Sequence, residues 1–143
     1  MDFKISPIQF TLDILSRKWT IEILENLRTG RKRYSDLLNL NEQITSKVLS
    51  ERLKELYELG LIDKIITNIM PVKAKYELTE KGHYLIPIFF EMALFSSLNF
   101  PEIIFTNDRT REDEIVTYFG NHYNLNTDEM KVIKMRLKRS NER

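Results

Sequence analysis

Cysteine is absent from this chain of 143 residues. The protein therefore forms no disulfide, holds no metal through a thiolate and cannot sense an oxidant through a thiol. A run of about 18 apolar residues, the length of a membrane-spanning helix, is missing as well. Residues 1–6 also lack the basic and apolar pattern of a secretory signal. From these absences we expect a soluble, cytoplasmic protein with no membrane partner.

A strong charge of either sign is also missing, because 22 Lys and Arg residues stand against 21 Asp and Glu residues. The total charge gives no support to nucleic-acid binding, but its distribution does. Residues 31–75 hold nine basic and six acidic side chains, whereas residues 91–120 hold two basic and six acidic ones. A nearly neutral protein can in this way present a basic patch.

Motifs of catalysis are not found in the sequence. The two histidines, His83 and His122, have no further ligand at metal-binding spacing, and neither a glycine-rich phosphate loop nor a G-x-S-x-G turn occurs. Carboxylates are numerous, but no spacing singles out a pair. We expect a protein that is not an enzyme and that uses no metal or cofactor.

The most informative segment begins at Thr45, whose hydroxyl can accept from the free N–H groups of a first helical turn. Apolar residues then recur every three or four positions, which predicts an amphipathic helix over Thr45–Leu59. Gly60 follows and can adopt the left-handed conformation that ends helices. The polar face of this helix comprises Ser46, Lys47, Ser50, Lys54 and Tyr57, with Arg52 at its margin.

Two strands are predicted after this helix. Residues 61–69 are rich in isoleucine, which favours a strand, and Pro71 interrupts the run. Residues 73–78 then alternate between polar and apolar side chains, the period of a strand with one wet face and one buried face. Two strands joined by a proline turn predict a small antiparallel β-hairpin.

Two further helices are predicted upstream. Residues 18–28 carry apolar side chains at helical spacing and end before Gly30, and a second helix begins at Ser35. Polar residues 39–43 supply the turn before the next helix. Helix, helix, turn, helix and hairpin is the order of a winged helix-turn-helix protein. Phosphate contact is the natural use of a basic triplet between the first two of these helices, Arg31, Lys32 and Arg33.

These segments together resemble the HxlR-type winged-helix regulators, which belong to the broader MarR-like superfamily. The family's order and spacing are shared by Lys18-Trp19, Gly30, Tyr34-Ser35-Asp36-Leu37, Lys47-Val48-Leu49-Ser50 and Leu78-Thr79-Glu80-Lys81-Gly82. The match covers approximately residues 6–98. The resemblance implies a homodimeric, cytoplasmic transcriptional regulator. Such a protein places one recognition helix per subunit in successive major grooves and its wing near the flanking minor groove.

The implied fold is mainly α with a small antiparallel β-hairpin, a winged helix-turn-helix with additional N- and C-terminal dimerisation helices. We assign residues 1–98 to the HxlR-like domain, including the dimerisation helices, and residues 99–143 to a C-terminal helical extension of unknown role. Within the extension, residues 108–118 and 127–137 have helix-like patterns. The basic residues of 131–143 form either an arm that contacts DNA or the solvated end of a helix, which is the commoner use of a short charge run.

One position departs from the family pattern. Many HxlR-type proteins carry a Cys-Pro pair near the amino terminus, and some sense electrophiles or oxidants through that cysteine. The matching pair here is Ser6-Pro7. A hydroxyl, with a pKa far above that of a thiol, cannot replace the cysteine as a nucleophile. The thiol-sensing mechanism therefore does not carry over to this chain.

A dimer interface is predicted from an unusually apolar helix over residues 79–95, which Thr79 caps and which Pro87 should kink or break. The helix is more apolar than one buried stripe requires, so part of it should meet a second subunit. The N-terminal helix over residues 7–15 is the expected partner surface. The predicted interface comprises Ile8, Leu12, Leu15, Ile88, Phe89, Met92 and Phe95.

The candidate DNA-binding residues follow from these placements. In the recognition helix they are Thr45, Ser46, Lys47, Ser50, Arg52 and Lys54. Lys47 and Ser50 are the best candidates for base edges or nearby phosphates, because they lie in its first turns. Arg52 has the alternative role of pairing with Glu51, Glu55 or Asp36. Contacts to the DNA backbone are assigned to Arg31, Lys32, Arg33, Lys73 and Lys75, although exposed strand lysines also protect sheet edges.

The sequence therefore predicts a regulator that binds double-stranded DNA sequence-specifically, as a homodimer on an inverted-repeat operator. The alternative is a winged-helix module that binds protein instead of DNA. Besides duplex DNA and a second copy of the chain, the remaining partner class is a small-molecule effector, which no motif identifies.

Overall fold

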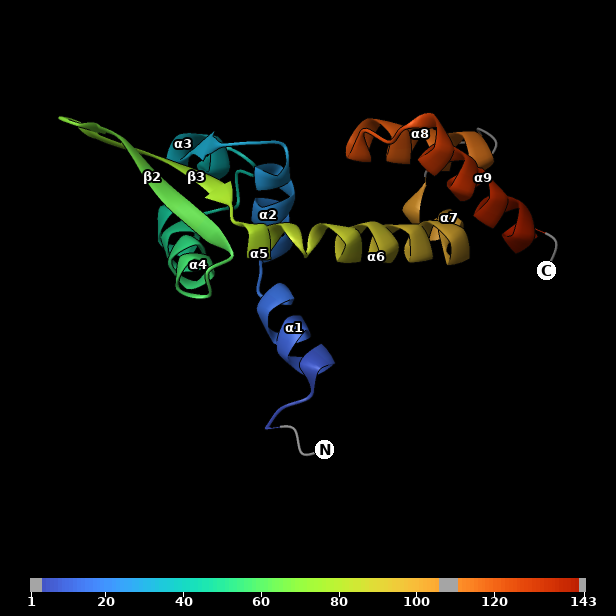
Figure 1. The fold of residues 1–143 in the computed structure, drawn as a ribbon, viewed down its shortest axis with the longest axis horizontal. Helices are drawn as coiled ribbons and strands as arrows, with labels where there is room; N and C mark the ends of the chain where they lie inside the picture. The colour runs from blue at the N-terminus through green and yellow to red at the C-terminus, as the bar shows by residue number, and fades with distance from the viewer. Residues whose placement is uncertain (1–3, 106–110, 142–143) are drawn as a thin grey trace. The chain divides into compact units, whose positions relative to one another are not determined.

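The computed structural model describes residues 4–105 and 111–141. Contacts divide the chain into two compact units, residues 1–86 and residues 87–143. The boundary predicted from the sequence, after residue 98, differs from this division and lies inside the helix Ile86–Asn99. Figure 1 gives the labels of the helices and strands.

The first unit is a winged helix-turn-helix, as the sequence predicts. Its elements in chain order are α1 (Pro7–Leu15), α2 (Thr20–Arg28), β1 (Lys32–Arg33), α3 (Tyr34–Leu38), α4 (Ser46–Glu58), β2 (Ile62–Ile69), β3 (Val72–Leu78) and α5 (Glu80–His83). The predicted helix over Thr45–Leu59 is α4, with Thr45 as its cap. The predicted hairpin is β2 and β3.

Local chemistry explains where α4 begins and ends. The Thr45 hydroxyl accepts from the backbone N–H of Val48 at 3.3 Å, which satisfies one of the free donors of the first turn. At the other end, Gly60 has φ +70°, in the left-handed region that costs a glycine little. The predicted boundaries of the recognition helix are thereby confirmed.

The sheet has three strands rather than the two of the predicted hairpin. Its order is β1-β3-β2 and both pairings are antiparallel. The third strand, β1, consists of Lys32 and Arg33 alone and pairs with Tyr76 and Lys75 of β3. Two residues are too few to show a period of two, so the sequence gives no sign of this strand.

Buried aliphatic side chains join the helices of the first unit to the base of the sheet. Fully or nearly fully buried are Ile23, Leu24 and Leu27 of α2, Leu37 of α3, Leu49, Leu53 and Leu56 of α4, and Ile62 of β2. The stripe predicted for α4 is thus the one that enters the core. β2 and β3 extend beyond these helices as a projecting wing (Figure 1).

The helix predicted after Thr79 is broken, as Pro87 suggests. α5 ends at His83, and α6 begins at Ile86 and continues to Asn99. Pro87 sits in the first turn of α6, where its missing N–H costs no hydrogen bond. The N-cap role predicted for Thr79 is confirmed, because its hydroxyl accepts from the Gly82 N–H at 3.0 Å.

The second unit consists of helices around a core of its own. After α6 come α7 (Pro101–Ile104), α8 (Arg111–Tyr123) and α9 (Thr127–Asn141). Of the helix predicted over residues 108–118, residues 108–110 lie outside the described residues, as do residues 142–143 of the basic terminal stretch. The core consists of Leu94 from α6, Ile115 and Phe119 from α8, and Ile133 and Leu137 from α9.

Aromatic rings extend this core. Phe90 of α6 meets Phe119 and Tyr123 edge to face, with ring centroids 5.2 and 5.1 Å apart. Arg136 of α9 also bonds Glu91 of α6 at 3.0 Å. The C-terminal extension is therefore packed against one face of α6. None of the described helices is long and apolar enough to cross a membrane.

Candidate nucleic-acid interface

The start of α4 presents the polar face that the sequence predicts for DNA contact. Thr45, Ser46, Lys47 and Ser50 are all exposed, and within the described ranges Lys47 forms no ion pair. Lys54 lies one turn further along, with 75% of its side chain exposed and Glu58 at 3.9 Å. An ion pair this long and this exposed restrains a lysine only weakly. The first two turns are therefore accessible to a ligand.

Tyr34 of α3 fixes the position of this exposed turn. Its hydroxyl donates to the Ser46 carbonyl oxygen at 2.9 Å and lies 3.0 Å from the Ser50 hydroxyl. Because the single tyrosine proton is used on Ser46, the Ser50 hydroxyl acts as the donor in the second bond. The sequence alone predicts no role for Tyr34, although the Tyr-Ser-Asp-Leu motif that contains it is a signal of the family. Two helices are thus joined at the residues proposed to enter the groove.

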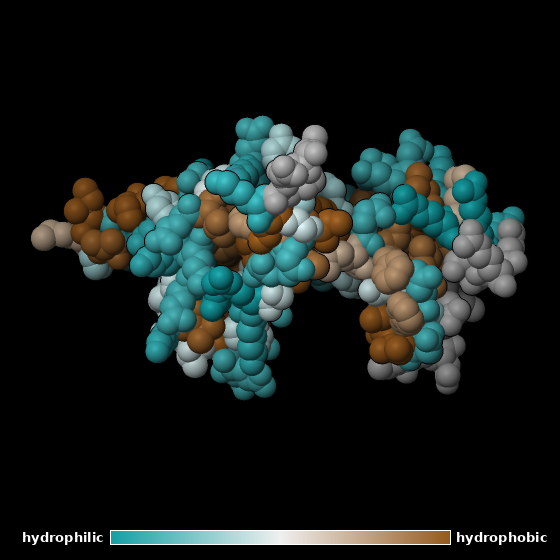
Figure 2. All heavy atoms as spheres, turned by 90° about the horizontal axis from the view of Figure 1, so that it is seen from below, coloured by the Kyte–Doolittle hydropathy of each residue, from teal (hydrophilic) through white to brown (hydrophobic). Residues whose placement is uncertain are grey.

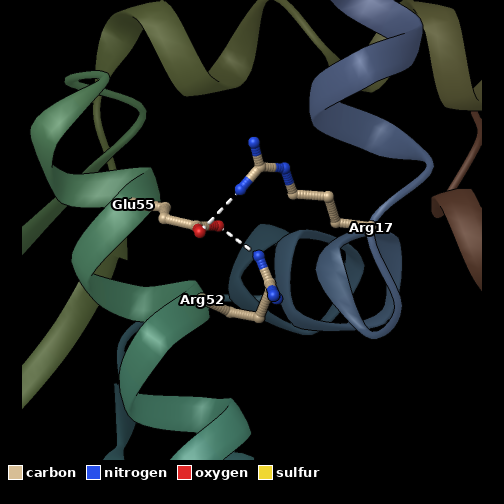
Figure 3. Close-up of polar contacts among 3 residues, drawn as sticks. All are labelled: Arg17, Arg52 and Glu55. Carbon is tan, nitrogen blue, oxygen red and sulfur yellow. Dashed lines mark hydrogen bonds and ion pairs between the residues drawn. The ribbon is translucent and has the colours of Figure 1, made fainter.

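Arg52 does not belong to the exposed face. Its guanidinium forms a short ion pair with Glu55, one turn along α4, and only 17% of its side chain is exposed. Arg17, which follows α1, bonds the same carboxylate at 2.6 Å (Figure 3). Of the two roles open to Arg52, the structure shows the ion pair with Glu55. A DNA contact by Arg52 stays a prediction.

The end of α4 is held by the segment that follows β3. The Thr79 hydroxyl donates to the Gly60 carbonyl oxygen at 2.6 Å, and the Lys81 ammonium donates to the Leu59 carbonyl oxygen at 2.7 Å. The Leu59 carbonyl is among those that a helix end leaves without a partner inside the helix. At Gly82, a Cβ atom would lie 2.1 Å from the Leu61 carbonyl oxygen, so only glycine fits there. The Leu-Thr-Glu-Lys-Gly motif therefore closes the recognition helix.

The basic triplet has two kinds of environment. Arg31 forms a bidentate contact with Glu77 of β3, and the hydrogen bond to that carboxylate raises the pKa of the Arg31 guanidinium. More than half of the Arg31 side chain is still exposed. Arg33 is exposed and lies opposite Lys75 in the sheet. Pairing of β1 with β3 thus sets a cation of the triplet beside a cation of the wing.

Two lysines of the wing lie on the face of β3 opposite to Tyr76. Lys73 and Lys75 alternate along β3 with Ala74 and Tyr76, and Tyr76 is buried, which raises the pKa of its hydroxyl. Lys73 is exposed and Lys75 is half-buried. In the described residues neither of them forms an ion pair. Their placement is compatible with phosphate contact.

The residues predicted for a dimer interface fall into two groups. Ile8 and Leu12 of α1 are 74% and 47% exposed, and α6 exposes Ile88, Met92 and Phe95 at 41%, 45% and 60%. Leu15 and Phe89, in contrast, are each 4% exposed. The chain itself buries these two side chains, so they are corrected from interface to core. The exposed residues of α6 recur at four and three positions, which places them on one stripe.

Within residues 4–105 and 111–141 no group of three or more His, Asp or Glu side chains is placed to hold a metal ion. The surface instead combines exposed hydroxyls and cations over α4, β1 and β3, which is the chemistry that phosphates and base edges require.

The match to a family model decides the classification. Residues 14–103 match the model described as HxlR-like helix-turn-helix. The chain belongs to the HxlR-like family. The resemblance seen in the sequence motifs is confirmed by this match, which begins near the end of α1, ends inside α7 and does not reach α8 or α9.

Known HxlR-like relatives are regulators. The chain is 36% identical over 91 residues to the uncharacterised HTH-type transcriptional regulator YdeP of Bacillus subtilis, covering 64% of this chain and 71% of the relative. It is also similar to the solved reduced form of the transcriptional regulator YodB from B. subtilis. That structure has a TM-score of 0.61 and 31% identity, and the match covers 67% of this chain and 95% of YodB.

A third similar structure is the redox regulator HypR in its reduced form, with a TM-score of 0.62 and 32% identity, covering 66% of this chain and 93% of HypR. YodB has been solved in reduced and diamide-treated forms, and HypR in reduced and oxidised forms. This HxlR-like chain has no cysteine and carries Ser6 before Pro7, where the Ser6 hydroxyl caps α1. Thiol chemistry is therefore not available to it.

Proposed function

We propose that this protein is a transcriptional regulator that binds duplex DNA as a homodimer and recognises an inverted repeat. The observation that carries the proposal is the exposed first turn of α4. Tyr34 holds the start of this helix, and Thr79 and Lys81 hold its end. A helix fixed in this way presents Ser46, Lys47 and Ser50 without a large loss of conformational entropy on binding.

The wing and β1 supply the positioning contacts. Arg33 and Lys75 lie side by side in the sheet. Lys73 precedes Lys75 by two residues in β3 and lies on the same face. Contacts from such cations go to phosphate and fix the register of a protein on DNA without reading its sequence. We assign base reading to the start of α4 and phosphate holding to Arg33, Lys73 and Lys75.

The second subunit is assigned to the exposed apolar residues of α1 and α6. Exposed apolar side chains gathered on one helix stripe are typical of protein interfaces. A twofold dimer then presents two copies of α4, which calls for two half-sites with inverted symmetry, about 10 base pairs apart or a multiple of that.

The test is binding of the full chain to a random-sequence pool of duplex DNA at low salt, followed by footprinting on the duplexes recovered. The proposal expects retention that weakens as salt rises, because cations on phosphates release counterions. It also expects a protected region with two inverted halves. Failure to retain duplex DNA even at low salt contradicts the proposal and favours the protein-binding alternative. A single protected half-site removes the dimer part alone.

A further inference from the structure

The end of the wing is apolar and exposed to an unusual degree. The wing tip is defined here as Ile69, Met70, Pro71 and Val72, the last residue of β2, the turn and the first residue of β3. Ile69, Met70 and Val72 are 79%, 87% and 70% exposed. Figure 2 shows apolar residues gathered at this projecting end of the hairpin. Four consecutive apolar residues in water are unfavourable unless something covers them.

The wing tip continues the buried face of the sheet. Tyr76 and Leu78 of β3 are buried at the base of the hairpin. On the same face, Lys64 lies opposite Tyr76, and further out come two directly opposed apolar pairs, Ile66 with Ala74 and Ile69 with Val72. Ile66 is already 52% exposed. The apolar face of the hairpin therefore runs past the end of the core that covers its base.

Charge along the hairpin changes at the same place. Asp63 and Glu77 face each other near the base. Beyond them, residues 64–75 contain Lys64, Lys73 and Lys75 and no acidic residue. These three lysines form no ion pair within the described part of the chain. The distal hairpin thus combines an apolar tip with a cationic stem.

A polyanion with an apolar interior fits this combination, and duplex DNA is one. Phosphates line the two walls of the minor groove, which is about 6 Å wide, and base pairs form its floor. Isoleucine, methionine and proline are among the side chains that proteins insert between base pairs from this groove. A second wing is a poor occupant, because it would bring three more lysines against the first three. The cationic stem is also continuous with Arg33, through the pairing of Arg33 with Lys75.

We propose that the wing tip enters the minor groove beside the half-site and wedges between base pairs, bending the DNA, while Lys64, Lys73 and Lys75 hold the phosphates on either side. This inference rests on the proposed function and adds a deformation of the DNA to it. Specificity would then come partly from the ease with which a base step opens, at positions where the wing makes no hydrogen bond.

The experiment uses the full chain and a duplex that the wild-type protein recovers from a random-sequence pool. Bending is followed by energy transfer between dyes at the two ends, and unstacking by the fluorescence of 2-aminopurine placed at successive adenines. The variants are Met70→Ser and the double exchange Ile69→Thr with Val72→Thr, which keeps β-branched residues in the strands. The matched control is Met135→Ser, an exposed methionine of α9 at 58% exposure.

The wild-type protein and the Met135→Ser control should bend the duplex and raise 2-aminopurine fluorescence at one step in each flank. The wing-tip variants should leave the duplex straight and bind it about tenfold more weakly, with the salt dependence unchanged because the lysines remain. Circular dichroism should show the same melting temperature for all variants, since the exchanged side chains are exposed.

Three results overturn the inference while the proposed function stands: a straight duplex in the wild-type complex, the same bend in the wing-tip variants, or affinities within a factor of two of each other. Vesicles containing phosphatidylserine serve as a second probe. If the wing-tip exchanges abolish vesicle binding and leave DNA bending intact, the tip meets a lipid surface and the wedge is wrong. Failure of the wild-type protein to retain any duplex removes both proposals.

Discussion

The Thr79 hydroxyl donates to the Gly60 carbonyl oxygen at 2.6 Å while accepting from the Gly82 N–H at 3.0 Å. One side chain therefore closes the end of α4 and opens α5. This double role explains why a threonine beyond the hairpin belongs to the motif that marks the family. The hydrogen bonding at the end of the recognition helix therefore depends on a residue 19 positions further along the chain.

Exchange of Thr79 for valine should remove both hydrogen bonds while keeping the shape of the side chain. Because Thr79 is part-buried, the free energy of unfolding should fall by about 1–3 kcal/mol. Urea denaturation followed by circular dichroism measures the change. Thr67→Val is the matched control, since the Thr67 hydroxyl bonds the Lys73 carbonyl oxygen on the exposed wing. An equal loss for both variants would show that Thr79 has no special place.

Gly82 and Gly120 should respond in opposite ways to alanine. A Cβ at Gly82 would lie 2.1 Å from the Leu61 carbonyl oxygen, so Gly82→Ala must displace the backbone that follows α4. A Cβ at Gly120, inside α8, would contact the Met130 side chain at 3.5 Å, an ordinary distance. We expect Gly82→Ala to destabilise the protein and Gly120→Ala to stabilise it by up to about 1 kcal/mol. Thermal unfolding of both variants is the measurement, and a neutral Gly82→Ala would contradict the close approach.

Lys47 and Lys73 should differ in how they affect DNA binding. Lys47→Ala should weaken binding to the recovered duplex by about 1–3 kcal/mol and binding to random DNA much less, because it lies at the start of α4. Lys73→Ala should weaken both alike and lower the salt dependence by about one unit of slope. Gel shifts on both duplexes over a series of salt concentrations separate the two behaviours. Equal losses on both duplexes for Lys47→Ala would mean that it only holds phosphate.

Phe95 should respond to a charge in a way that an exposed residue outside the stripe does not. Phe95→Glu places a carboxylate in the stripe of α6 assigned to the second subunit, where burial without a partner is costly. Sedimentation should show a shift from dimer to monomer. Met135→Glu, at a position of similar exposure on α9, should leave the assembly unchanged. If both variants sediment like the wild type, α6 is not the contact.

The sequence predicts those elements whose signals are local. Thr45, Gly60 and the spacing of apolar residues between them define α4, and the proline turn divides the hairpin. β1 escapes prediction because its strand character comes only from pairing with Tyr76 and Lys75, more than 40 residues later. The sequence does not indicate the division after residue 86 either, because composition does not show that α8 and α9 pack against α6.

The candidate site was predictable to the same extent. The exposure of Lys47 and Ser50 follows from the helical period, whereas the pairing of Arg52 depends on Arg17 and Glu55 meeting in space. An apolar pattern also marks which side chains avoid water without saying what covers them. Leu15 and Phe89 share the pattern of Leu12 and Met92, yet the chain itself buries the first two. The role of Tyr34 cannot be read from the sequence, because its hydroxyl bonds Ser46 and Ser50, which lie 12 and 16 positions away.

Glu55 sits between two arginines of different origin, Arg52 on its own helix and Arg17 at the end of α1. α1 carries the exposed Ile8 and Leu12, so in the proposed homodimer the Arg17–Glu55 ion pair would connect the subunit contact with the recognition helix. Subunit association and the position of α4 would then be coupled in that dimer. Glu55→Gln, which keeps the shape and removes the charge, would loosen that linkage while leaving each surface intact.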